Sequence, residues 1–197
     1  MQTPEIIFAH GAGAGSSSPW MQAWTQRLQT IGNVYPFDYP YMEAGRRAPD
    51  RMPKLLAAHR AKLESIDRNG PVILCGKSMG SRVGCHLSLD MPVDGLICMG
   101  YPLGRAGKPL RDQVLLDLRT PILFAQGSRD PLCQLDLMQD VCERMTAPNT
   151  LCVVEGGNHS LAVGKRMLKA SGKTQEDHDE RVFAAIQRFV TEVIGQP

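Results

Sequence analysis

Short apolar runs alternate with longer amphipathic segments along the whole chain. The apolar runs are typical of buried strands, and the amphipathic segments repeat apolar side chains at helical spacing. The expected strands span residues 6–9, 34–38, 71–75, 95–100, 121–125 and 151–154. The expected helices span residues 20–28, 52–66, 79–89, 138–145 and 182–193. Thr174 and Asp177 precede the last helix with a spacing that resembles a capping box.

This alternation predicts an α/β fold. Continuous apolar strands separated by helices indicate about six mostly parallel strands, with helices on both faces of the sheet. No segment between the expected elements is long enough to form a large lid. Ligands of such sheets bind at the carboxyl ends of the strands, so functional residues are expected directly after each strand.

Length and composition fit one globular domain spanning residues 1–197, with 43% hydrophobic and 21% charged residues. A formal net charge of +2 gives no basic surface for nucleic acid or for an acidic membrane. The first residues show no basic region ahead of an apolar stretch, so we expect no signal peptide, and no apolar run is long enough to span a bilayer. We therefore expect a cytoplasmic protein without a membrane partner.

The six cysteines indicate neither a metal site nor a redox pair, because none of them forms a C-x-x-C motif. Cys75, Cys98 and Cys152 lie within expected strands, where a free cysteine behaves as a small hydrophobic residue. We expect reduced thiols, no metal and no cofactor.

The strongest chemical signal is the motif Gly76-Lys77-Ser78-Met79-Gly80, which matches G-x-S-x-G between an expected strand and an expected helix. A serine on such a tight strand-to-helix turn presents its hydroxyl above the sheet, and the flanking glycines make room for the strained backbone. The sequence therefore predicts Ser78 as a nucleophile. The structural alternative is a tight turn that contains a serine by chance.

A serine nucleophile needs a base, and His159 is the expected one because it follows the last strand. The other four histidines fit this role less well. His59 lies on the apolar stripe of a helix, His86 lies two turns into the helix after the nucleophile, His178 opens the last helix, and His10 belongs to a glycine-rich loop. The alternative for His159 is an ordinary loop histidine near the surface.

The imidazole needs an acid that orients it, and Asp130 follows the fifth strand in Gly127-Ser128-Arg129-Asp130-Pro131. Asp130 could instead cap the following helix, with Pro131 at its first position. Glu155 lies close enough to the last strand to remain an alternative acid. The order serine, acid, histidine is the order of the α/β-hydrolase architecture.

An oxyanion in this chemistry is usually held by two backbone N–H groups. One is expected from Met79, the residue after the nucleophile. The other is expected from the loop His10-Gly11-Ala12-Gly13-Ala14-Gly15, with Ala12 as the donor. This loop has neither the Lys-Ser/Thr ending of a P-loop nor the G-x-G-x-x-G spacing of a dinucleotide site, which argues against a nucleotide.

Substrate specificity is expected in the loops above the strand ends. We predict contacts from Gly11, Tyr39, Arg46 and Tyr101, since an arginine there could bind a substrate carboxylate. Arg105 is a further arginine near the same edge, and its orientation stays open.

The alternative for the arginines is structural. Arg46 and Arg47 could pair with Glu43 or Asp50 in their own loop, or remain solvated.

With these motifs, the chain resembles the small α/β-hydrolases of the dienelactone-hydrolase-like kind. It is more similar still to a compact branch of bacterial hydrolases related to the testis-expressed hydrolase-like proteins and to the hydrolase-like subunit of a chromatin acetylation complex. The segments that carry the resemblance span most of the chain: residues 10–15, 37–47 (FDYPYMEAGRR), 76–80, 127–131 and 157–160. The stretch from Tyr39 to Arg47 points to the compact branch.

The resemblance implies a hydrolase fold of six strands, without the first two strands of larger relatives, and carries the triad onto Ser78, Asp130 and His159. It supplies no substrate. A dienelactone hydrolase uses a cysteine nucleophile where this chain has Ser78, so the resemblance does not extend to that activity.

Two functions from different classes follow. The first is a serine hydrolase, of the carboxylic ester hydrolase class EC 3.1, that cleaves a small ester or thioester through an acyl-enzyme. The second is a hydrolase-like binding or scaffold protein with little turnover. The sequence does not indicate an oligomeric state.

Overall fold

Six parallel strands form one sheet within residues 2–195, the part of the chain that the computed structural model describes. In the order β2-β1-β3-β4-β5-β6, the strands are Asn33–Phe37, Glu5–Ala9, Val72–Lys77, Gly95–Met99, Ile122–Gly127 and Asn149–Val154. The expected six-stranded sheet is therefore confirmed, and it is parallel throughout the described residues.

Eight helices connect or flank these strands within the same residues. They are α1 Pro19–Leu28, α2 Pro40–Glu43, α3 Met52–Glu64, α4 Met79–Ser88, α5 Gln113–Asp117, α6 Leu135–Arg144, α7 Lys165–Ser171 and α8 Gln175–Ile194. The sequence pattern predicted all but α2, α5 and α7. Those three have four, five and seven residues, too few for an apolar repeat to show.

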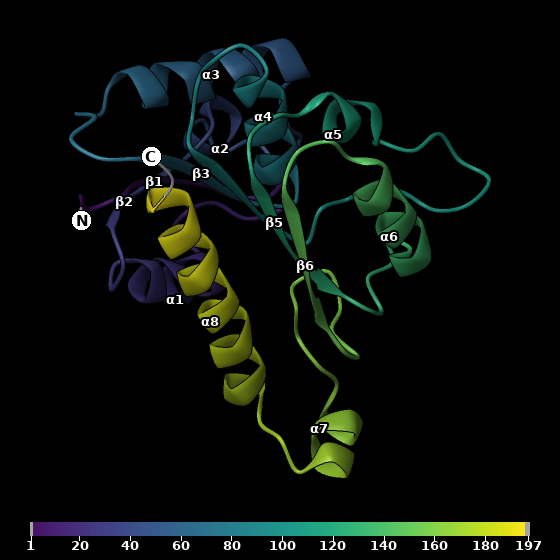
Figure 1. The fold of residues 1–197 in the computed structure, drawn as a ribbon. Helices are drawn as coiled ribbons and strands as arrows, with labels where there is room; N and C mark the ends of the chain where they lie inside the picture. Colours follow the sequence, from purple (N-terminus) through teal and green to yellow (C-terminus); the bar gives the residue numbers. More distant parts are fainter. Residues whose placement is uncertain (1, 196–197) are drawn as a thin grey trace.

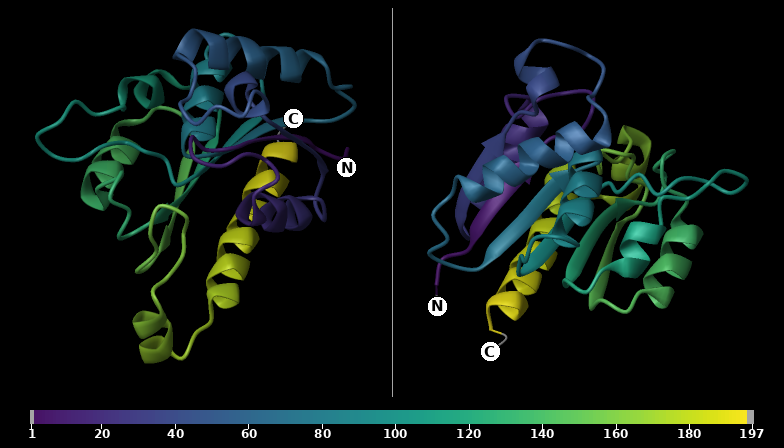
Figure 2. Two further views of the ribbon diagram at one scale, coloured as in Figure 1. Left: turned by 180° about the vertical axis from the view of Figure 1, so that it is seen from behind. Right: turned by 90° about the horizontal axis from the view of Figure 1, so that it is seen from above.

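Helices cover both faces of the sheet, as Figure 1 shows. The helices α1 and α8 lie side by side on one face, where Arg27 of α1 pairs with Glu176 of α8 (Figure 2). The helices α3 to α6 lie on the opposite face. Short α7 projects away from the sheet and buries none of its residues.

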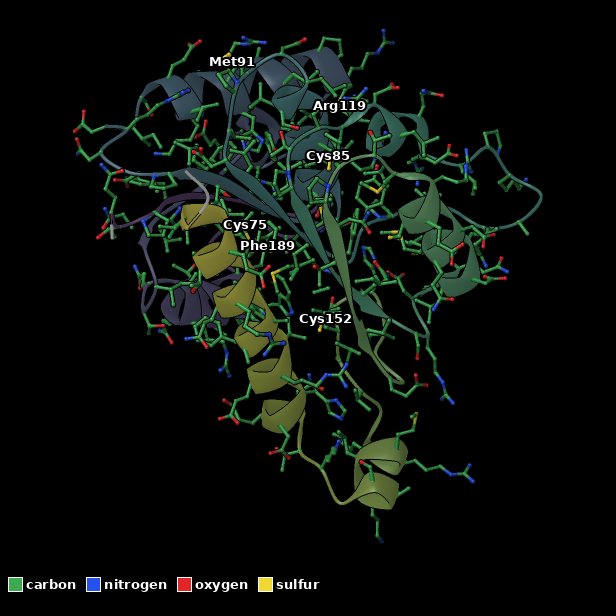
Figure 3. The ribbon with its side chains drawn as sticks, in the orientation of Figure 1. Cys75, Cys85, Met91, Arg119, Cys152 and Phe189 are labelled. Atoms are coloured by element: carbon green, nitrogen blue, oxygen red, sulfur yellow. The ribbon has the colours of Figure 1, made fainter. Side chains whose placement is uncertain are left out.

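The core is divided by the sheet into two apolar layers, because successive side chains of a strand point to opposite faces. Cys75 and Phe189 belong to the layer under α1 and α8, whereas Cys85 belongs to the layer under α3 to α6 (Figure 3). The four most buried cysteines thus act as small core residues.

The start of α8 is fixed by the capping box that the sequence indicated. The Asp177 N–H donates to the Thr174 hydroxyl at 3.1 Å, and the Thr174 N–H donates to the Asp177 carboxylate at 2.6 Å. Among residues 2–195, no helix combines the length and the hydropathy that crossing a bilayer requires.

His59 of α3 is fully buried, and its Nδ1 lies 3.1 Å from the Tyr39 hydroxyl. Burial disfavours the imidazolium and lowers the pKa of His59 from 6.5 to about 3.

We expect His59 to make the fold sensitive to acid. Below pH 6.5 the unfolded chain binds a proton at this position that the folded chain does not bind. The free energy of unfolding should therefore fall by about 1.4 kcal/mol per pH unit between pH 6 and pH 4, and be unaffected by this group above pH 7. Urea unfolding between pH 8 and pH 4 measures this slope. The His59→Gln variant should show a shallower decline, and an unchanged slope would exclude His59 as its source.

Candidate active site

The candidate site lies where the order of the strands reverses. The chain leaves β1 toward β2 at one edge, whereas it leaves β3 toward β4 in the opposite direction. Ala9 pairs with Gly76, so β1 and β3 end at the same level. The loops after these two strands diverge from that point and leave a crevice between them, which is where open parallel sheets bind ligands.

Ser78 occupies the sharp turn between β3 and α4. Its backbone has φ 51° and ψ −107°, a region that residues with a side chain rarely adopt. Such strain costs about 1–3 kcal/mol and persists only where the surroundings hold it. Here the Ser78 N–H donates to the Met99 carbonyl at 3.0 Å, and the Ser81 hydroxyl donates to the Gly76 carbonyl at 2.5 Å.

Gly80, in the first turn of α4, lets this helix start against β1. A Cβ at position 80 would lie 2.4 Å from the Ala9 carbonyl oxygen and 2.8 Å from that of His10. Only glycine fits so close an approach. The contact brings the Ser78 turn against the loop that follows β1.

Ser78, His159 and Asp130 form one hydrogen-bonded chain. The Ser78 hydroxyl lies 2.8 Å from His159 Nε2, and His159 Nδ1 lies 2.7 Å from the Asp130 carboxylate. A carboxylate only accepts, so Nδ1 carries the proton and Nε2 is free to accept the proton of the serine. The structure thus brings these three predicted residues together in the geometry of nucleophile, base and orienting acid.

Asp130 is almost fully buried, and every oxygen of its carboxylate is hydrogen-bonded. Gln126 and His159 donate to one oxygen at 2.7 Å each, and the Leu132 N–H donates to the other at 2.8 Å. Burial by itself would raise the pKa of Asp130, but these hydrogen bonds hold it below its usual value. Asp130 is not the cap of α6, because Gln134 occupies that position.

Glu155, the alternative acid, is exposed and accepts a hydrogen bond from the Ser128 hydroxyl at 3.1 Å. It makes no contact of this kind with His159, so the geometry favours Asp130.

The loop that carries His159 is held in place by its own polar groups. The Asn158 side chain accepts hydrogen bonds from the N–H groups of Ser160 and Ala162 at 2.8 and 3.1 Å. Gly127, at the end of β5, lets the loop approach, because a Cβ there would lie 2.3 Å from the Gly157 carbonyl. The base is therefore fixed against the strand that leads to its acid.

The glycine-rich loop after β1 is fixed from behind by the segment after β2. The Tyr39 N–H donates to His10 Nε2 at 3.1 Å, so His10 carries its proton on Nδ1 and donates it to the Gly11 carbonyl at 2.6 Å. The Tyr41 hydroxyl donates to the Ala12 carbonyl at 3.0 Å. These contacts hold the backbone of the loop beside Ser78, where Ala12 and Met79 are the predicted oxyanion donors.

A cavity of about 380 Å³ opens beside the Ser78 hydroxyl. Its walls combine small residues of the glycine-rich loop with apolar side chains from α1. The lining residues are Gly11, Ala12, Gly13, Ala14, Ser18, Trp20, Met21, Lys77, Ser78, Leu132, His159 and Ser160. Gly11, a predicted substrate contact, and Ala12, a predicted oxyanion donor, both line the cavity.

Lys77, the residue before the nucleophile, is only 9% exposed and also lines this cavity. Its ammonium donates to the His159 carbonyl and lies 5.2 Å from the centre of the Trp20 ring. Burial lowers the pKa of Lys77 to about 8, against the opposing attraction of Asp130.

The predicted substrate contacts from Tyr39, Tyr101 and Arg46 are wrong. Tyr39 and Tyr101 are fully buried and do not line the cavity. The Tyr39 hydroxyl is bonded to His59, and that of Tyr101 donates to the Arg111 carbonyl at 2.8 Å. Both rings serve as packing and anchoring groups, because their strand ends turn them into the core rather than toward the crevice.

Arg46 also lies outside the cavity. Its guanidinium binds both carboxylate oxygens of Asp50 at 2.9 and 3.0 Å on the surface, which is the structural alternative for this arginine. Arg105 is likewise exposed and does not line the cavity.

Sequence reasoning missed Trp20, Lys77 and Tyr41 as residues of the site. Lys77 occupies a variable position of the G-x-S-x-G motif, so the motif draws no attention to it. The apolar pattern places Trp20 in a helix, but it does not show that one face of that helix meets the strand ends. Within residues 2–195, no three His, Cys, Asp or Glu side chains are grouped as metal ligands.

Comparison with known proteins agrees with this fold. A family model described as an alpha/beta hydrolase domain matches residues 2–191. A lidless α/β serine hydrolase from Xanthomonas campestris superposes with a TM-score of 0.73 at 18% identity, covering 100% of this chain and 84% of that one. Dienelactone hydrolase from Anabaena variabilis gives 0.71 at 17% identity, with coverages of 96% and 86%.

Est1E from Butyrivibrio proteoclasticus is similar as well, with a TM-score of 0.71 at 16% identity and coverages of 99% and 90%. At identities this low, the likeness shows the shared fold.

Two glycines of α4 give a matched test of the contact between this helix and β1. Alanine normally stabilises a helix relative to glycine by up to about 1 kcal/mol. Gly80→Ala should instead lower the free energy of unfolding by about 2–3 kcal/mol, because its Cβ would overlap a backbone oxygen.

The control is Gly84→Ala, whose Cβ would meet Leu74 at an ordinary 3.5 Å and should leave stability equal or higher. Thermal and urea unfolding compare the two variants. Equal effects of both substitutions would contradict the role assigned to Gly80.

Proposed function

Because the chain belongs to the α/β-hydrolase domain family, we propose that it is a serine hydrolase that cleaves a small carboxylic ester or thioester through an acyl-enzyme. The observation that carries this proposal is the hydrogen-bonded chain from Ser78 through His159 to Asp130. A hydroxyl placed 2.8 Å from a neutral imidazole nitrogen is set up to lose its proton on attack.

In the first step the Ser78 oxygen attacks the carbonyl carbon of the ester while His159 Nε2 takes the serine proton. The resulting imidazolium lies beside the Asp130 carboxylate, whose negative charge stabilises it. His159 then returns the proton to the leaving alcohol or thiol, and the acyl group remains on Ser78. Water, activated by the same imidazole, releases the acid and restores the serine.

The tetrahedral intermediate carries a negative oxygen, for which Ala12 and Met79 are the proposed N–H donors. This proposal is supported by the contacts that fix the loop of Ala12 and the start of α4 at Met79. Tyr41 fixes the Ala12 carbonyl, and α4 starts at Met79 against β1. Donors held before the reaction need no reorganisation during it, which is the source of their effect.

The cavity supports a small substrate. Its volume of about 380 Å³ accommodates a short acyl chain, and its Trp20, Met21 and Leu132 side chains offer apolar contacts. We therefore keep the carboxylic ester hydrolases, EC 3.1, as the proposed class. The proposed location is the cytoplasm, since a reducing compartment suits free thiols.

A binding or scaffold protein without turnover is the competing function, and a fluorophosphonate probe separates the two. The wild type should be labelled covalently and should hydrolyse p-nitrophenyl acetate and butyrate. Ser78→Ala should lose the label, and both Ser78→Ala and His159→Ala should lose at least about 1000-fold in kcat/KM.

Circular dichroism and thermal unfolding of each variant control for folding. A folded wild type that is neither labelled nor active would reject the serine-hydrolase proposal and favour the binding protein.

The choice of acid gives a second test with a built-in control. Asp130→Asn should lower kcat by at least about 100-fold, because the amide can hold His159 in the wrong tautomer and cannot stabilise its positive charge. Glu155→Gln removes the rival carboxylate and should keep kcat within about twofold, since Glu155 contacts Ser128 at the surface. Steady-state kinetics on p-nitrophenyl butyrate measures both. The reverse pattern would assign the acid to Glu155.

A further inference from the structure

Lys77 is a buried cation that the proposed acyl transfer does not use. It is the one Lys, Arg, Asp or Glu side chain that lines the cavity within the described residues, and it directly precedes Ser78. The residue is only 9% exposed, so it has lost most of its contact with water. Buried charges are normally paired, so the surroundings of this ammonium require an explanation.

The groups in direct contact with the ammonium are uncharged, and Asp130 attracts it without forming an ion pair. The ammonium donates to the His159 carbonyl and lies 5.2 Å from the centre of the Trp20 ring. No carboxylate within residues 2–195 forms an ion pair with it, since Asp130 uses its oxygens for His159, Gln126 and Leu132. An ammonium has three N–H donors, and a carbonyl and an aromatic face do not neutralise it.

The hydrogen bond to the His159 carbonyl does not by itself explain why this position holds a lysine. A neutral amide could donate to the same carbonyl without the desolvation of a full charge. The contact does not need the charge, and Lys77 lines the cavity in which a substrate would meet Ser78. A partner for an ion pair would thus arrive with the substrate.

We propose that Lys77 binds an anionic group of the substrate, so that the preferred ester carries a free carboxylate a few bonds away from the scissile carbonyl. This inference rests on the proposed function and specifies its substrate class. Trp20, Met21 and Leu132 contact the apolar part of such a substrate, and the carboxylate pairs with the ammonium at the wall. The carboxylate can belong to the acyl group or to the alcohol.

Two substrate pairs test the proposal and distinguish these sources. The acyl pair is the mono-p-nitrophenyl ester of adipic acid against its methyl p-nitrophenyl diester. The alcohol pair is 4-acetoxybenzoate against its methyl ester. In at least one pair, the wild type should show a kcat/KM at least about tenfold higher for the anionic member, mainly through a lower KM. Equal or lower values for the anionic member in both pairs would overturn the proposal.

For each variant we compare the ratio of kcat/KM for the anionic member of a pair to kcat/KM for the neutral member. A general loss of activity affects both values equally and leaves this ratio unchanged. Lys77→Met keeps the length of the side chain without its charge and should bring the ratio to about one, whereas Lys77→Arg should keep most of the preference. Lys62→Met is the matched control, because Lys62 also lies over an aromatic ring, 5.4 Å from the centre of Tyr35, but outside the cavity. Its ratio should equal that of the wild type.

Equal losses on both members of each pair in Lys77→Met would show that Lys77 only positions His159, which also overturns the proposal. Hydrolysis of the neutral esters without a preference for the anionic members rejects this inference alone and leaves the serine-hydrolase proposal intact.

If no ester is turned over, calorimetry of the Ser78→Ala protein with adipate monomethyl ester and with dimethyl adipate tests the inference by binding. Tighter binding of the monoester supports the proposal, and equal binding overturns it.

Discussion

The contact between the first turn of α4 and the end of β1 is the constraint on which the site depends. Gly80 has no side chain, so the helix begins against the carbonyl groups of Ala9 and His10. This approach places the strained Ser78 turn beside Gly11, whose Cβ position lies 3.5 Å from that of Ser78. One backbone contact therefore sets the separation between the nucleophile and the loop that would hold the developing charge. The His159 loop is placed in a similar way by Gly127 against Gly157.

Behind the loop after β1, several side chains with polar groups lie buried beside the apolar cluster that includes Leu55 and Val83. His10, Tyr39, Tyr41 and His59 are all fully buried, and their contacts run from α3 to the carbonyls of the loop. Inside a protein such hydrogen bonds are strengthened by the low dielectric, and an alternative arrangement would leave polar groups unpaired. The loop is consequently held in one conformation before any substrate arrives, as electrostatic catalysis requires.

The sequence was sufficient for the fold and for the residues whose place is marked by local signals. Apolar runs located the six strands, and Ser78, Asp130 and His159 each follow a strand in a recognisable motif. Tyr39 and Tyr41 could not be placed this way, because their direction depends on the four-residue α2, which has no periodic signal. Lys77 was missed because it ends a buried strand, and the sequence does not show that a cavity lies beside it.

The parallel topology also determines when this site can exist during synthesis. Ser78 meets a base that lies 81 residues later in the chain, and α8, which follows that base, packs across β4, β5 and β6. Until residues 175–194 have left the ribosome, the face of the sheet that contains Ile97 and Leu123 lacks its cover. The nascent chain therefore presents a continuous apolar surface of the kind that chaperones bind. The hydrogen bond between Ser78 and His159 can form only after residue 159 has emerged, and the burial of that surface follows only when α8 has emerged.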